Sequence, residues 1–197
     1  MRFMKTNLFF IAVAFSVLSI HAAVAPQPPK GWFVAGSHRR EYVASLDRES
    51  RHTGKASAHF ESAVLKTGGF GTLMQVFQAA DFRSKRVRLS GYVRSRNVQD
   101  WAGLWMRVDG AGGKSLAFDN MQDRPIKGTS DWTKYEIVLN VPAQAEQIAY
   151  GILLTGRGDV WMDDLKFEVV GDATTTTTDG NAGKIPDAPV NLDFEQN

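Results

Sequence analysis

The chain has 197 residues, contains no cysteine, and carries 23 Lys and Arg against 21 Asp and Glu. This length suits one domain with or without terminal extensions. The absence of cysteine excludes disulfide bonds, thiolate zinc sites and a cysteine nucleophile. A content of 43% hydrophobic and 11% aromatic residues excludes a wholly disordered chain.

Residues 1–25 have the pattern of a secretory signal peptide. Arg2 and Lys5 precede an apolar run over residues 8–20, and small residues follow at 22–25. The run is too short to span a bilayer, which needs about 20 apolar residues, so we expect export to the periplasm or the medium followed by cleavage. Cleavage removes both cations and leaves 21 basic and 21 acidic residues. This balance argues against nucleic-acid binding and favours a neutral ligand. We expect no membrane span in the mature chain, because no other stretch is long and apolar enough to form one.

Residues 26–170 alternate apolar and polar side chains over short runs, which is typical of β-strands. The runs cover residues 42–47, 56–61, 70–78, 86–94, 103–108, 134–141, 148–154 and 165–169. Glycine-rich turns separate many of them, and residues 143–147 are expected to make one short helical turn at most. About eight strands without a long helical stripe indicate an all-β antiparallel sandwich or jelly roll, with a closed barrel as the alternative.

The C-terminal region changes composition after Val170. Residues 171–185 are polar and include five consecutive threonines, which predicts a flexible linker. Residues 186–197 contain alternating Val190, Leu192 and Phe194. We expect these residues to form a further strand that packs on the sandwich, and the alternative is a frayed end.

Four motifs resemble the galactose-binding-like jelly-roll fold of secreted carbohydrate-binding modules. They are HTGKAS at 52–57, VRLSGYVRS at 87–95, WTKYE at 132–136 and VWMDDL at 160–165. Residues 103–129 are similar to a poorly characterised group of bacterial proteins, some secreted alone and others attached to AraC-type regulators. The resemblance covers residues 32–170 and implies a module that binds a carbohydrate.

In such modules an N-x-x-F-E motif opens the first strand, but here NLDFE stands at residues 191–195. We predict that this segment closes the sandwich in place of a first strand, or exchanges into a second copy of the chain. The resemblance also implies a structural calcium ion held by Glu195 and by Asp163 or Asp164. Asp163 has the strand parity of Leu165, which predicts an inward carboxylate that needs a cation or several N–H donors.

No catalytic motif is present. The three histidines after residue 25 lack metal-ligand spacing, and the sequence contains neither a nucleophile elbow nor a phosphate-binding loop. Asp119 and Asp123 are a carboxylate pair of the kind glycoside hydrolysis uses, but one loop carrying both is unusual for that chemistry. We therefore predict a protein that is not an enzyme.

The candidate binding residues combine a flat aromatic ring with polar groups that pair with hydroxyls. Trp105 shares a strand face with Arg107, opposite Leu104 and Met106. The alternative, which has equal weight, is that both faces of that strand are buried. The polar loop at 119–124 is either a recognition loop or a structural crossover, and its candidate residues are Asp119, Asn120, Gln122, Asp123 and Arg124. Trp132 and Trp161 are expected in the core. The predicted ligand is a carbohydrate or another small polar molecule. The first alternative is a protein-interaction or envelope-structural module, and the second is a small enzyme that acts on glycans.

Overall fold

The computed structural model describes residues 26–177 and 188–196. The described residues form nine strands and three short 3-10 turns, and none of them is in an α-helix. No helix in this part of the chain is long and apolar enough to cross a membrane. The strands are β1 (Phe33–Ala35), β2 (Tyr42–Asp47), β3 (Ser57–Ser62), β4 (Phe70–Gln78), β5 (Lys85–Gly110), β6 (Lys114–Asp119), β7 (Ile126–Val141), β8 (Gln147–Thr155) and β9 (Asp159–Val170).

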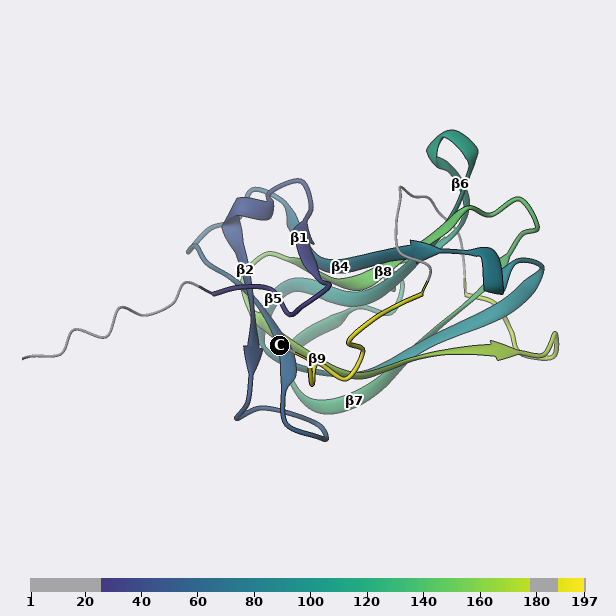
Figure 1. Ribbon diagram of the computed structural model, residues 1–197. Coiled ribbons are helices and arrows are strands. Elements are labelled where there is room, and N and C mark those ends of the chain that lie inside the picture. The colour runs from purple at the N-terminus through teal and green to yellow at the C-terminus, as the bar shows by residue number, and fades with distance from the viewer. Residues whose placement is uncertain (1–25, 178–187, 197) are drawn as a thin grey trace, which may run out of the picture.

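The strands form two layers that share the long strand β5 (Figure 1). In the first layer, the C-terminal half of β5 pairs with β8 and β6, and β4 and β1 continue the layer beyond β8. In the second layer, the N-terminal half of β5 pairs with β7 and β9, and β3 and β2 continue beyond β9. Every pairing is antiparallel, which confirms the predicted all-β antiparallel sandwich.

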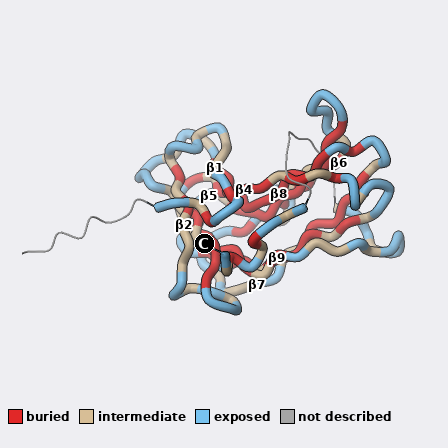
Figure 2. Tube along the Cα trace, viewed as in Figure 1, coloured by how far each residue is buried: buried red, intermediate tan, exposed pale blue. Residues whose placement is uncertain are grey.

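The hydrophobic core lies between the layers, and its residues alternate with outward residues along each strand. Figure 2 shows buried segments along the strands and exposed segments at many of the connecting loops. The largest fully buried side chains include Phe60, Leu73, Phe77, Leu89, Leu104, Met106, Ile137, Ile148 and Tyr150. Both halves of β5 contribute to this core.

The runs predicted at 86–94 and 103–108 belong to one strand. Residues 95–102 of β5 stay paired with β7 through three register shifts, so no turn interrupts them. Gly128, which the sequence suggests as a turn residue, lies within β7 opposite Val98 and has φ +68°. A bulge of this kind bends a strand without ending it, which lets β5 pass from one layer to the other.

A second bulge changes the orientation of Asp163. The pairing of β5 with β9 shifts between Ser90 and Tyr92, and Asp164 has φ +49°. Asp163 is buried as predicted, but its carboxylate points to the backbone of the 52–53 turn and not into the sandwich core. The prediction assumed a regular strand, and the bulge breaks that alternation.

The C-terminal segment packs on the sandwich as an irregular stretch, not as the predicted strand. The indole Nε1 of Trp32 donates to the Asn191 carbonyl at 3.2 Å, and the Leu165 N–H donates to the Leu192 carbonyl at 3.1 Å. The Phe194 ring is fully buried with its centroid 5.3 Å from that of Trp32. Asn191 and Phe194 have φ near +50° and +58°, and such residues cannot continue an extended strand.

The remaining predicted boundaries fall partly outside the described residues. The predicted signal peptide at 1–25 lies wholly outside them, as do residues 178–187 of the predicted linker and tail. Residues 171–177 run beside β7, where the Thr177 N–H donates to the Val138 carbonyl at 2.6 Å.

Candidate functional site

A cavity of about 280 Å³ opens on the outer face of the first layer. All five strands of that layer contribute to it, because outward side chains of neighbouring strands stand side by side across a sheet. The lining residues are Ala35, Gly36, Phe70, Thr72, Met74, Trp105, Arg107, Phe118 and Leu153. Several of them belong to a second hydrophobic cluster, separate from the core between the layers. An apolar cavity with few polar groups is the usual form of a small-molecule site.

Trp105 is held rigidly beside this cavity. Its indole Nε1 donates to the Thr72 hydroxyl at 2.7 Å, and that hydroxyl donates to the Ile152 carbonyl at 2.8 Å. Only 5% of Trp105 is exposed, so the ring forms part of the cavity floor and its polar edge is already bonded. The structure therefore places Trp105 on the predicted outward face of β5 but covers most of it.

Phe70, which is 36% exposed, and the partly buried Phe118 provide further aromatic surface around Trp105. Gly103, on the same face of β5, allows the loop after β6 to approach closely. A Cβ atom on Gly103 would lie 2.8 Å from the carbonyl oxygen of Asn120. The loop thus packs against this face through its backbone.

Arg107 and Asp109 form a weakly compensated charge pair next to the cavity. The Asp109 carboxylate is fully buried, and its nearest oxygen lies 3.7 Å from the Arg107 Nε atom. Neither carboxylate oxygen of Asp109 nor the Arg107 Nε atom has a hydrogen-bond partner among the described residues, and the same holds for the Gln147 Oε1 atom opposite Asp109. Burial raises the pKa of the Asp109 carboxyl to about 7, although the Arg107 charge opposes the rise.

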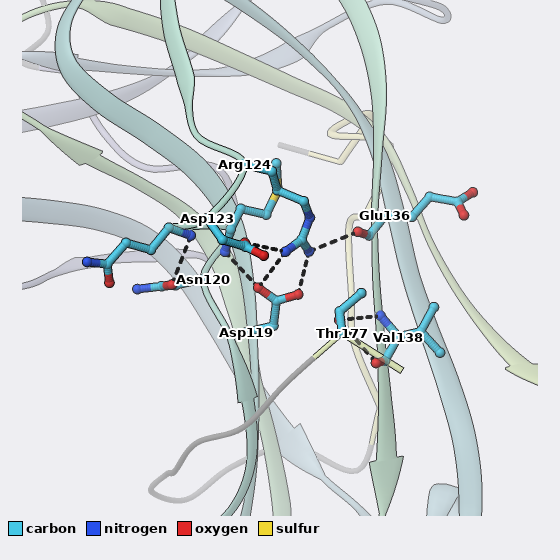
Figure 3. A network of polar contacts seen from close by, with 9 residues as sticks. Asp119, Asn120, Asp123, Arg124, Glu136, Val138 and Thr177 are labelled. Carbon is cyan, nitrogen blue, oxygen red and sulfur yellow. Dashed lines mark hydrogen bonds and ion pairs between the residues drawn. The ribbon is translucent and has the colours of Figure 1, made fainter. Parts of the chain in front are cut away.

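The predicted recognition loop at 119–124 is a structural crossover (Figure 3). Asp119 is opposite Met106 in the β5–β6 pairing, so its side chain faces the sandwich interior and is 3% exposed. Both of its oxygens bond to the Arg124 guanidinium, which also donates to the Glu136 carbonyl at 3.4 Å. The loop residues predicted to bind ligand do not line the cavity; they are Asp119, Asn120, Gln122, Asp123 and Arg124.

Short-range hydrogen bonds fix the rest of that loop. The Met121 N–H donates to Asp119 Oδ1 at 2.7 Å, and the Gln122 N–H donates to Asn120 Oδ1 at 3.1 Å. Asp123 contributes a further ion pair to Arg124 at 2.9 Å from an exposed position. These contacts orient the loop, and they also occupy several of the polar groups that a ligand would use.

The carboxylates predicted to hold calcium are bonded to N–H and O–H donors. Asp163 accepts hydrogen bonds from the His52 N–H at 2.8 Å, the Thr53 N–H at 3.2 Å and the Asp164 N–H at 2.8 Å. Asp164 accepts from the Thr53 hydroxyl at 2.7 Å and lies 2.6 Å from the His52 Nδ1 atom.

Glu195 accepts from the Lys55 and Ala56 N–H groups and lies 3.3 Å from the Lys55 ammonium. This donor set fits the alternative of carboxylates held by protein hydrogen bonds. The Glu195 Oε2 atom is buried without a hydrogen-bond partner among the described residues. Calcium binding stays a prediction.

The outer face of the second layer carries a different cluster. Trp161 is buried as predicted, with 5% of the residue exposed, but it lies outside the cluster between the layers. Its ring stacks on His59 at 4.5 Å and lies under the Arg96 guanidinium at 5.0 Å. His59, Glu61 and Asp159 bring potential metal ligands within 4.8 Å of one another, but Asp159 is already paired with Arg96 at 2.7 Å. Protein groups therefore already occupy the Asp159 carboxylate, which also lies 3.1 Å from the His59 Nε2 atom.

Trp132 is also absent from the core, because it is partly exposed and lies beside His52 at 5.8 Å between ring centroids. The core prediction for Trp132 and Trp161 rested on their position next to strong strand patterns. Such a position does not determine which face of the sheet a tryptophan occupies.

Sequence reasoning found Trp105 and Arg107 but missed the other residues of the cavity. Phe70 lies on a strand with apolar residues on both faces, and Phe118 has the strand parity of Leu116, which packs against the core, so alternation does not distinguish the cavity face from the core face. The Asp109-Gly110 pair is typical of a turn, yet the structure places Asp109 within β5. Its parity with Trp105 and Arg107 was the signal that could have placed it on the same face.

No protein-family profile matches the sequence. The chain is 45% identical over 168 residues, or 85% of its length, to the uncharacterized HTH-type transcriptional regulator YbfP of Bacillus subtilis (strain 168). The chain spans 57% of the length of that protein. A helix-turn-helix motif needs two helices, and the part of our chain described here contains no α-helix, so this part does not form one.

Solved structures share the fold at low sequence identity. The CBM22-1 xylan-binding domain of Paenibacillus barcinonensis Xyn10C is similar with a TM-score of 0.53 and 14% identity, over 73% of this chain and 89% of that domain. A cyclase from Fischerella sp. TAU is similar with a TM-score of 0.51 and 13% identity, over 81% of this chain and 89% of the cyclase. The fold therefore serves both binding modules and enzymes, and the function must be argued from the site.

Proposed function

We propose that this chain is a non-catalytic module that binds a saccharide in the cavity on the outer face of the first layer. The observation that carries the proposal is the cavity beside Trp105, Phe70 and Phe118, with Arg107 at its edge. The C–H face of a sugar ring packs on aromatic and apolar surface, while its substituents pair with nearby polar groups.

The lining of the cavity supports binding without chemistry. Among its nine described lining residues, none is Asp, Glu or His. Glycoside hydrolysis uses two carboxylates on either side of the scissile bond, and general acid–base catalysis needs a titratable group within reach of the reacting atoms. The Thr72 hydroxyl is occupied by bonds to Trp105 and Ile152.

The shared fold of the xylan-binding domain supports the proposal by analogy. Export to the periplasm or medium is a part of the proposal that rests on Arg2, Lys5 and the apolar run at 8–20. The identity to YbfP favours a second candidate function, in which a domain of this kind provides the ligand-binding part of a transcriptional regulator. Both candidate functions require a ligand that binds in the cavity. They differ in the cell compartment in which the protein acts.

The test is a glycan array followed by calorimetry on the saccharides that bind. Phe70→Ala removes a partly exposed ring from the cavity, and we expect it to weaken binding about tenfold, since one aromatic contact contributes roughly 0.5–1.5 kcal/mol beyond its buried area. Trp105→Phe keeps the floor apolar but breaks the bond to Thr72, and it should also weaken binding.

Leu65→Ala is the matched control, because Leu65 is 82% exposed and borders a different hollow between β3 and β9. Loss of binding in Leu65→Ala with unchanged binding in Phe70→Ala would place the ligand elsewhere and overturn the proposal. A complete absence of saccharide binding would also overturn it.

A further inference from the structure

Arg107 is the one charged residue among the nine described residues that line the cavity. Its side chain is 35% exposed, and its guanidinium carbon lies 5.7 Å from the centroid of the Trp105 ring. A cation in a largely apolar cavity loses part of its hydration and needs a negative partner to offset that cost. Arg107 is therefore the feature of the cavity that the saccharide proposal alone leaves unexplained.

The protein itself supplies only part of that negative partner. Asp109 is the carboxylate nearest to Arg107, yet its closest oxygen is 3.7 Å from Nε, beyond hydrogen-bond distance. The pKa of Asp109 is raised by burial to about 7, so the carboxyl is partly protonated at neutral pH. Asp109 thus compensates the positive charge of Arg107 only in part, and that charge lies beside an aromatic surface.

We propose that the cavity selects an acidic sugar, whose carboxylate pairs with Arg107 while its ring packs against the aromatic and apolar lining near Trp105. This inference rests on the proposed saccharide-binding function and specifies its ligand class. A guanidinium presents paired N–H donors that match the two oxygens of a carboxylate. The arrangement also replaces the expectation of a neutral ligand, which was drawn from the net charge of the chain and not from the charge of the site.

The experiment compares one oligosaccharide with and without its charge. Trigalacturonate and its methyl ester have the same rings, and they differ in the carboxylates. We expect the wild-type protein to bind the acid at least tenfold more tightly than the ester, because a hydrogen-bonded charge pair typically changes affinity about ten- to a hundredfold.

Variants then assign the preference to one side chain. Arg107→Gln should bring the ratio of acid to ester affinity to within about threefold, and Arg107→Lys should restore part of the ratio because the charge returns without the paired geometry. Arg48→Gln is the control, since Arg48 is exposed in the turn between β2 and β3 and does not line the cavity. Thermal melts check that each variant is folded.

Different failures separate the two proposals. Equal wild-type affinity for acid and ester, with binding still lost in Phe70→Ala, overturns the acidic-sugar inference and leaves the saccharide proposal standing. A preference for the acid that persists in Arg107→Gln, or disappears in Arg48→Gln, also overturns the inference. No binding to any saccharide on the array overturns both. If Arg107→Gln does not fold, the wild-type salt dependence decides, because added salt should weaken binding of the acid and not of the ester.

Discussion

The buried carboxyl of Asp109 should make the stability of the protein fall as the pH rises. Its pKa is raised from 3.8 to about 7 in the folded chain, because burial disfavours the charged form more than Arg107 favours it. Between about pH 4 and pH 7 the folded state therefore binds a proton that the unfolded state has released. This contribution to stability is complete below about pH 4, is lost as the pH rises through 7, and changes little above that.

Replacing Asp109 by asparagine removes this ionisation and keeps the shape of the side chain. Each pKa unit corresponds to about 1.36 kcal/mol, and two units separate pH 5 from the raised pKa, so between pH 5 and pH 8.5 the variant should gain about 2.7 kcal/mol relative to the wild-type protein. Urea unfolding at pH 5, 7 and 8.5 measures the difference in the free energy of unfolding between the two proteins. We expect Asp109→Asn to be the more stable protein at pH 8.5, with a melting temperature higher by several degrees.

The comparison has a matched control in Asp172→Asn, because the Asp172 side chain is 99% exposed. That substitution should change the free energy of unfolding by no more than about 0.5 kcal/mol at any of the three pH values. If the difference between wild type and Asp109→Asn is the same at pH 5 and pH 8.5, the carboxyl is not held in a low-dielectric site and the reasoning is refuted.

Two further predictions concern the ends of the chain. Phe194→Ala should lower the free energy of unfolding by roughly 3–5 kcal/mol, because the ring is fully buried against Trp32, whereas Val169→Ala at a 54% exposed position should have little effect. Equal melting curves for the two variants would contradict the packing of residues 188–196, and a wild-type melting temperature that falls on dilution would indicate exchange of that segment into a second copy. Cell fractionation should find the protein outside the cytoplasm and a variant lacking residues 2–25 inside it, and equal distributions would refute export.

The sequence predicted most strands, since alternation, turn residues and strand length are local properties. It missed that residues 86–94 and 103–108 form one strand, because the bulges opposite Val98 depend on β7, which is distant in sequence. Asp163 shows the same limit: its inward orientation followed from parity, and one residue at φ +49° was enough to reverse it. Register shifts are set by pairing partners, so a single sequence does not reveal them.

Of the predicted binding residues, Trp105 and Arg107 line the cavity and those of the 119–124 loop do not. The difference again depends on contacts between parts of the chain that are distant in sequence. Trp105 and Arg107 were found because two polar or amphipathic side chains alternate with Leu104 and Met106 on a single strand. The loop at 119–124 was chosen for its polarity, yet Asp119 and Arg124 bond to each other. The composition of a loop shows how many hydrogen-bonding groups it carries. It does not show whether those groups are already bonded to other protein groups.

The two outer faces of the sandwich differ in a way that favours the first layer as the site of ligand binding. On the second layer, the Arg96 guanidinium lies over Trp161 and has a protein partner, Asp159, at 2.7 Å. On the first layer, Met74, Leu153 and Trp105 form an apolar cluster outside the core, with the charge of Arg107 beside it. A ligand that covers outward apolar surface is stabilised by roughly 25 cal/mol for each Å² removed from water. A neutral sugar would cover this apolar surface without pairing with Arg107, and an inorganic anion would pair with Arg107 without covering the surface. An acidic sugar would do both.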